Sequence, residues 1–193
     1  MKKTITILAS ILITVSSFAQ NQQSAHLSFK GVPIDGTLNE YVTKMKECGF
    51  SHEGTEDGVA VLKGDFAAYK NCMVLVSTLK KKDLVSKISV VFPECDTWSS
   101  LSSNYFLLKD LLTEKYGKPS DCVEKFQNKY ADDDNLKMSE VKMNGCKYFT
   151  SYETEKGSIQ LSIGASEMNC FVILEYFDKI NGGIIKAHAI DDL

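Results

Sequence analysis

The chain has 193 residues, of which 44% are hydrophobic and 24% are charged, and its formal net charge is −3. These values are typical of a soluble globular domain and disfavour a disordered chain, a collagen-like repeat or a polytopic membrane protein. All 22 basic residues are lysines, and the chain lacks arginine, which proteins commonly use for bidentate contacts with phosphates and guanine. We therefore expect no nucleic-acid partner.

The first 19 residues have the three parts of a secretory signal peptide. A basic start, Lys2-Lys3, is followed by an apolar stretch, Ile5–Val15, and by a small-x-small cleavage site, Ser17-Phe18-Ala19. The apolar stretch is shorter than the ~20 residues that a transmembrane helix needs. We expect residues 1–19 to be removed on export. Residues 20–193 would then form a single domain, periplasmic or secreted, without membrane insertion.

Two segments carry the apolar periodicity and the end signals of helices. In the first, Thr37–Glu40 has the form of a capping box, an apolar face follows, and Gly49 lies at the expected C-terminal end. In the second, Asp96 or Thr97 begins a longer helix that Gly117 ends.

Strand-like runs follow each of these helices. They are Gly58–Lys63, Cys72–Thr78, Leu84–Phe92, Cys122–Gln127, Val141–Tyr152, Ser158–Ile163 and Cys170–Phe177. Lys80–Asp83 reads as a hairpin tip, and Asp132–Asn135 as a charged turn rather than a calcium loop. The sequence therefore predicts an α+β fold, in which helices cover an antiparallel sheet built from two approximate repeats of one helix and three or four strands, residues 28–95 and 96–177.

Six cysteines recur at a nearly constant interval. They are Cys48, Cys72, Cys95, Cys122, Cys146 and Cys170. Each cysteine of the first half has a counterpart 74 or 75 residues later, which is consistent with an internal duplication.

An even number of cysteines in an exported protein favours disulfides. In a hairpin centred on Asp134, Cys122 and Cys146 would face each other at a distance that a disulfide can span. The repeat then pairs Cys48 with Cys72 and leaves the remaining two cysteines unassigned. The alternative for each cysteine is a buried free thiol.

Three segments resemble a family of uncharacterised exported proteins of Gram-negative bacteria. They are Ser17-Phe18-Ala19-Gln20, the stretch FKGVPIDGT at 29–37, and KYGKP at 115–119. The resemblance spans most of the mature chain and implies no activity, cofactor or site residue. In outline, the order of helices and strands is also similar to the β-lactamase-inhibitor protein fold and to small outer-membrane assembly factors.

No motif in the sequence identifies a catalytic, cofactor or metal site. His52, with Glu53 and Asp57 nearby, is the one local cluster suited to metal binding or acid–base chemistry, although such a histidine is more often a solvated surface group. Trp98 is either a core residue or an exposed anchor of an interface.

We therefore expect a non-enzymatic binding module whose partner is another envelope or extracellular protein. The alternatives are an envelope-assembly factor and a small hydrolase whose active-site residues are dispersed along the chain.

The signal-peptide interpretation predicts that protein recovered from the periplasm or the medium begins at or near Gln20. Intact-mass analysis of the purified protein checks this. A full-length chain recovered only from the membrane fraction would contradict it.

Overall fold

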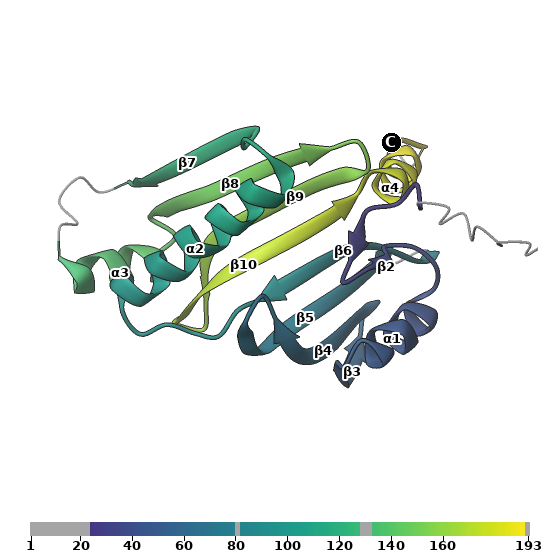
Figure 1. The fold of residues 1–193 in the computed structure, drawn as a ribbon, viewed down its shortest axis with the longest axis horizontal. Helices are drawn as coiled ribbons and strands as arrows, with labels where there is room; N and C mark the ends of the chain where they lie inside the picture. Colours follow the sequence, from purple (N-terminus) through teal and green to yellow (C-terminus); the bar gives the residue numbers. More distant parts are fainter. Residues whose placement is uncertain (1–23, 80–81, 128–132, 192–193) are drawn as a thin grey trace, which may run out of the picture.

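The computed structural model describes residues 24–79, 82–127 and 133–191 (Figure 1). The predicted signal peptide, Lys80, Lys81 and Asp132 lie outside the described residues. In the described part, no helix combines the length and the apolar character needed to cross a membrane.

An eight-stranded antiparallel sheet runs through the molecule (Figure 1). Its strands are β3 (Ser51–Glu56), β4 (Val59–Phe66), β5 (Tyr69–Leu79), β6 (Lys82–Val91), β7 (Asp121–Phe126), β8 (Cys146–Thr154), β9 (Gly157–Ser166) and β10 (Asn169–Asp178). Their order across the sheet is β3-β4-β5-β6-β10-β9-β8-β7. The last strands of the two halves, β6 and β10, therefore pair at the centre, where Leu174 lies opposite Val90.

Three helices pack against the sheet and a fourth continues from its central strand. They are α1 (Leu38–Glu47), α2 (Trp98–Tyr116), α3 (Asp134–Lys142) and α4 (Lys179–Asp191). Helix α1 packs on β4, β5 and β6, while α2 and α3 pack on β8, β9 and β10 (Figure 1). A short hairpin of β1 (Ser28–Phe29) and β2 (Val32–Pro33) precedes α1.

The predicted α+β class with a helix-covered antiparallel sheet is confirmed. Each half of the chain contributes four strands preceded by a helix, α1 or α2, and the second half has the further helix α3 inserted between β7 and β8. The sheet order places the two sets of strands symmetrically about the β6–β10 contact. The origin of this layout in a duplication, and the repeat boundaries, stay predictions.

Local sequence signals account for the start of α1. The Thr37 hydroxyl accepts a hydrogen bond from the Glu40 N–H, and the Glu40 carboxylate accepts one from the Thr37 N–H, which is the predicted capping box. Leu38, Tyr41 and Met45 then bury one face of the helix.

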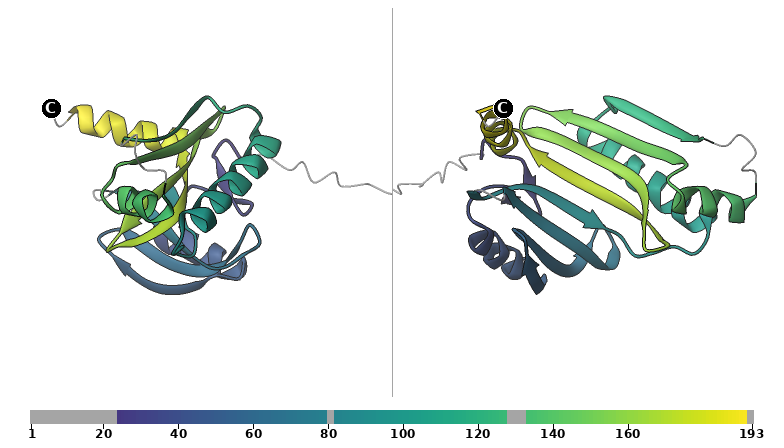
Figure 2. Two further views of the ribbon diagram at one scale, coloured as in Figure 1. Left: turned by 90° about the vertical axis from the view of Figure 1, so that its left-hand side faces the viewer. Right: turned by 180° about the vertical axis from the view of Figure 1, so that it is seen from behind.

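Successive side chains of each strand point to opposite sides of the sheet, which therefore has two different faces. On the helix-covered face, Leu62, Val74 and Val90 lie side by side on β4, β5 and β6, and all are fully buried. Their neighbours in sequence point to the opposite face, which α1, α2 and α3 do not cover. The view from behind shows β8, β9 and β10 in front of α2 (Figure 2). We call this second face the open face.

The predicted strand Val141–Tyr152 is wrong at its beginning. Val141 is buried on α3, and β8 begins only at Cys146. Asp133 caps α3 by accepting hydrogen bonds from the N–H groups of Asn135 and Leu136. Asp133 to Asn135, predicted as part of a charged turn, therefore begin a helix.

Trp98 is a core residue and not an exposed anchor. It is 8% exposed, and its ring packs edge-on against Phe126 at 4.8 Å and Tyr148 at 5.1 Å between ring centres. The register of β7 with β8 aligns these two rings on the face under α2, so the start of α2 closes over them.

Two buried tyrosines on the covered face differ in how their hydroxyls are satisfied. Tyr105 and Thr150 share a hydroxyl hydrogen bond of 2.6 Å, whereas the Tyr41 hydroxyl has no partner among the described residues. Burial raises the pKa of both phenols, so both stay neutral at physiological pH.

We predict that Tyr105→Phe lowers the free energy of unfolding by about 1 kcal/mol, because the buried hydrogen bond between the Tyr105 and Thr150 hydroxyls is lost. Tyr41→Phe should leave the stability unchanged or raise it, because it removes an unpaired buried hydroxyl. Urea denaturation of both variants checks the contrast. Equal losses in the two variants would contradict it.

Candidate functional site

A hollow of about 670 Å³ lies on the open face, where β4, β5, β6 and β10 approach the β9–β10 turn. Its apolar lining consists of Met73, Leu75, Val91, Phe92, Pro93 and Phe171, and its polar lining of Lys63, Asn71, Glu94, Ser166, Glu167 and Asn169. A volume of this size lies in the range of small-ligand and side-chain pockets.

Strand register gathers the apolar residues of the hollow. Met73 on β5 lies opposite Val91 on β6, which lies opposite Ile173 on β10. Phe171 lies opposite Gly164, where a Cβ would meet the Ile173 side chain at 3.2 Å. Gly164 therefore leaves room for the two larger side chains on β10.

Flexible apolar side chains are unusually accessible at this end of the sheet. Met73 is 47% exposed, and Met168 on the neighbouring β9–β10 turn is 67% exposed. Methionine adapts its shape to a partner, so exposed methionines beside a hollow favour contact with apolar groups.

Charges at the rim of the hollow are mainly acidic. Glu94 and Glu167 contribute two carboxylates and Lys63 contributes one ammonium group, and all three side chains belong to exposed residues. The rim therefore favours a group with positive charge beside the apolar lining.

Beyond the hollow, the centre of the open face holds a compensated charge. Glu175 on β10 accepts hydrogen bonds from Lys87 at 3.1 Å and from the Ser89 hydroxyl at 3.0 Å. Because both donors lie on the neighbouring β6, this carboxylate is paired within the sheet and adds little to the acidity of the rim.

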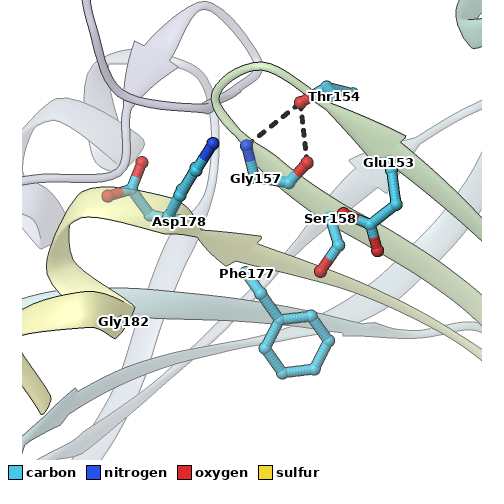
Figure 3. Close-up of a pocket in the computed structure, with 8 residues that line it drawn as sticks. Glu153, Thr154, Gly157, Ser158, Phe177, Asp178 and Gly182 are labelled. Carbon is cyan, nitrogen blue, oxygen red and sulfur yellow. Dashed lines mark hydrogen bonds between the residues drawn. The ribbon is translucent and has the colours of Figure 1, made fainter. Parts of the chain in front are cut away.

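A second, smaller pocket of about 290 Å³ lies between the β8–β9 turn and the start of α4 (Figure 3). The Thr154 hydroxyl donates to the Gly157 carbonyl at 2.7 Å and accepts from the Gly157 N–H at 3.1 Å, which holds the turn. A Cβ at Gly157 would lie 2.0 Å from the Phe177 carbonyl oxygen, so the close approach of the strands requires glycine there.

Asp178 lines this second pocket, but protein groups already use its carboxylate. It accepts hydrogen bonds from the Leu27 N–H at 2.8 Å and the Asn181 N–H at 2.9 Å, and His26 Nδ1 lies 3.0 Å away. Asp178 is 1% exposed. Its contacts join the N-terminal segment to the start of α4, so its role is to hold the fold.

His26 is a residue that the sequence does not single out. Its ring lies between Asp178 and Asp35, with Nε2 3.5 Å from the Asp35 carboxylate. Burial raises the pKa of Asp35, but hydrogen bonds from the Gly36 N–H and Asn181, together with nearby positive charge, hold that pKa below its ordinary value. The contact with Asp178 spans 152 positions, so no local pattern reveals it.

His52 lies on the edge strand β3 and is exposed. Its Nε2 lies 2.9 Å from both the Gly54 carbonyl oxygen and the Thr55 hydroxyl, so the ring bonds to its own strand. Throughout residues 24–79, 82–127 and 133–191, no three histidine, cysteine, aspartate or glutamate side chains come together in a metal-binding group.

The predicted pairing of Cys122 with Cys146 is wrong, as is the register on which it rested. Cys122 lies opposite Thr150 and Cys146 lies opposite Phe126, so the true register differs by four positions. The reason is that α3 occupies the connection and moves the start of β8. All six cysteines are free thiols in this structure.

The second predicted pair, Cys48 with Cys72, is also unbonded. Cys48 caps the end of α1, whereas Cys72 is buried in β5, with its thiol directed at the carbonyls of Phe66 and Tyr69. The cysteine spacing matches Cys72 on β5 with Cys146. The sheet order makes β9 the equivalent of β5, but Cys146 lies at the start of β8. The cysteine interval therefore does not follow the structural repeat.

Cys122 belongs to a small polar cluster between α2 and β7. The Lys109 ammonium donates to Cys122 Sγ at 3.3 Å and pairs with the Glu124 carboxylate. Burial raises the pKa of the Glu124 carboxyl, but the hydrogen bonds from Lys109 and Cys122 have the larger effect, so the pKa lies below its ordinary value. The cluster secures the edge strand β7 to α2.

No protein-family model, curated protein sequence or solved structure matches this chain.

The six thiols should differ in reactivity, because their accessibility differs. Cys122 is exposed, Cys72 is fully buried, and burial, followed by the neighbouring Cys170 thiol, raises the pKa of Cys146 to about 12. We predict that a short pulse of N-ethylmaleimide at pH 7 modifies Cys122 first and leaves Cys72 and Cys146 largely unmodified.

Tryptic mapping checks this order, because each cysteine lies in a different tryptic peptide. The peptides are 47–63, 71–80, 88–109, 116–125, 143–147 and 157–179. Modification of all six peptides at one rate in the native protein, as in the denatured control, would contradict the described burial.

Proposed function

We propose that this protein is an exported, non-enzymatic binding module whose open face binds an extended segment of an envelope or extracellular protein. In this proposal an apolar side chain of the partner enters the hollow, and a neighbouring lysine or arginine lies against the acidic rim. The observation that carries the proposal is the hollow itself, with its accessible apolar lining and two rim carboxylates.

The apolar character supports a partner with a large side chain. Met73, Leu75, Val91 and Phe171 converge on one hollow from three strands, and Met73 is half exposed in the free protein. Covering this surface with a leucine, methionine or aromatic side chain would remove apolar area from water at roughly 25 cal/mol per Å².

The shape of the open face supports an extended segment. A row of residues crosses five strands from Met73 through Val91, Ile173 and Ser162 to Phe149. With strands about 4.8 Å apart, the row spans roughly 19 Å, the length of about six residues of extended chain. A peptide along this row would continue to meet apolar side chains beyond the hollow.

Charge supports a basic partner. Glu94 and Glu167 outnumber Lys63 at the rim, Glu175 is compensated by Lys87, and the whole chain carries a formal net charge of −3. Complementary charge speeds association and orients the partner, and added salt should weaken the binding because it screens these charges. The exported location rests on the signal-peptide pattern of residues 1–19.

The experiment uses fluorescein-labelled hexapeptides in which each position is apolar, basic, acidic or neutral polar. We predict that the protein selects peptides with a large apolar residue beside a lysine or arginine, and that fluorescence polarisation shows weaker binding as salt rises. Met73→Lys should weaken the best peptide at least tenfold, because it places a charge in the hollow.

Two further variants separate the apolar and charge contributions. The double variant Glu94→Gln/Glu167→Gln should lose the preference for basic peptides while still binding apolar ones. Leu107→Lys is the matched control, because Leu107 is 53% exposed on α2, on the other side of the sheet. Binding that survives Met73→Lys, or that Leu107→Lys weakens equally, would place the binding surface elsewhere, and a failure to select any peptide class would also overturn the proposal.

A further inference from the structure

The cysteine spacing leaves Cys95 and Cys170 without an assigned partner. In the structure they lie opposite each other, with Cys95 just after the end of β6, where the chain leads to α2. The Cys95 N–H donates to the Cys170 carbonyl at 2.9 Å, and the Phe92 N–H donates to the Val172 carbonyl at 3.0 Å. These two bonds continue the β6–β10 ladder past the last paired residue of β6.

An extra residue in this stretch brings the two cysteines into register. Between the two hydrogen bonds the chain advances by two positions on β10, from Cys170 to Val172, and by three on the other side, from Phe92 to Cys95. Such an insertion of one residue is a β-bulge, and the bulged segment between Phe92 and Cys95 contains Pro93. Residues opposed in antiparallel pairs have Cα atoms about 4.5–5.5 Å apart, within the range that a disulfide spans.

Both side chains lie on the helix-covered side of the sheet. Cys170 is 1% exposed among the core residues. Cys95 is partly buried, and its sulfur accepts a hydrogen bond from the Asn104 amide on α2 at 3.3 Å. The accessible thiol and the buried thiol are therefore adjacent on one face.

The other cysteines are less suited to pair with either. Cys146 lies on β8, separated from Cys170 by β9, because Cys170 pairs with Ala165 on β9. Cys72 directs its thiol at the turn of its own hairpin. The remaining two cysteines lie at the end of α1 and on the edge strand β7.

We propose that Cys95 and Cys170 are a thiol pair that a disulfide oxidant, such as glutathione disulfide, converts into a reversible intramolecular disulfide. This inference does not depend on what the open face binds.

The reaction is two successive thiol–disulfide exchanges. Deprotonated Cys95, the accessible member, attacks one sulfur of glutathione disulfide, so that the S–S bond breaks and one glutathione thiolate leaves. Deprotonated Cys170 then attacks the Cys95 sulfur of the mixed disulfide and displaces the second glutathione thiolate. The two protein thiols lose two electrons, glutathione disulfide gains them, and the two protons end on the two glutathione thiols.

Burial sets the pH dependence of this oxidation. It raises the pKa of both thiols, and for Cys170 the nearby Lys142 opposes the rise while the Cys95 thiol adds to it. Only the thiolate is nucleophilic, so oxidation should be slow at neutral pH and accelerate as pH rises.

The bond would fix one wall of the hollow. Glu94 precedes Cys95, and Asn169 and Phe171 flank Cys170, and all three residues line the hollow. Oxidation would thus tie the connection between β6 and α2 to the first residues of β10.

The test oxidises the reduced, purified full chain with glutathione disulfide at pH 8, blocks the remaining thiols with N-ethylmaleimide in denaturant, and maps the tryptic peptides without reduction. We expect peptide 88–109 joined to peptide 157–179, with the joined mass two hydrogen atoms below their sum. The other four cysteine peptides should be blocked, and reduction should separate the pair.

Two variants control the assignment. Cys146→Ser should keep the joined peptides, because Cys146 is the thiol one strand beyond the pair. Cys95→Ser should abolish them. Blocked Cys95 and Cys170 after oxidation, a stable mixed disulfide of glutathione with Cys95, or either cysteine joined to a different peptide would overturn the proposal.

Discussion

The antiparallel pairing of β6 with β10 is the contact on which the rest of the structure depends. It joins the last strand of each half, and buried residues such as Val90 and Leu174 face each other across it. Because the two sets of four strands meet in this way, α1 and α2 cover the same face of one sheet and share one core. Without this pairing, each half would expose the edge of its last strand and much of its apolar face to water.

The same pairing creates the open face. Side chains alternate along every strand, so each row buried under the helices has a neighbouring row on the other side. Met73 and Val91 lie opposite each other on β5 and β6 of the first half, and Phe171 on β10 joins them at the hollow only because strands from both halves are adjacent. The hollow is therefore a property of the joined sheet and belongs to neither half alone.

The sequence predicted the elements whose signals are local. The capping box at Thr37, the end of α2 at Gly117 and the apolar alternation of the inner strands each act over a few residues. It missed β3, because Ser51–Glu56 is mostly exposed and lacks alternation, and pairing with β4 is what makes it a strand. It also missed α3. This helix is short and buries only Met138 and Val141, and Val141 was assigned to the start of the following strand.

The sequence by itself determined the fold class, the two main helices and the order of most strands. Their signals, which are the hydrophobic periodicity, the helix caps and the turn residues, each lie within a single element. Only the tertiary structure decided the register of β7 on β8, the contact of His26 with Asp178 and the position of Cys95 opposite Cys170. Each depends on how residues far apart in the chain are aligned. An inserted helix or a single bulge residue changes that alignment without altering the local pattern of the strands it connects.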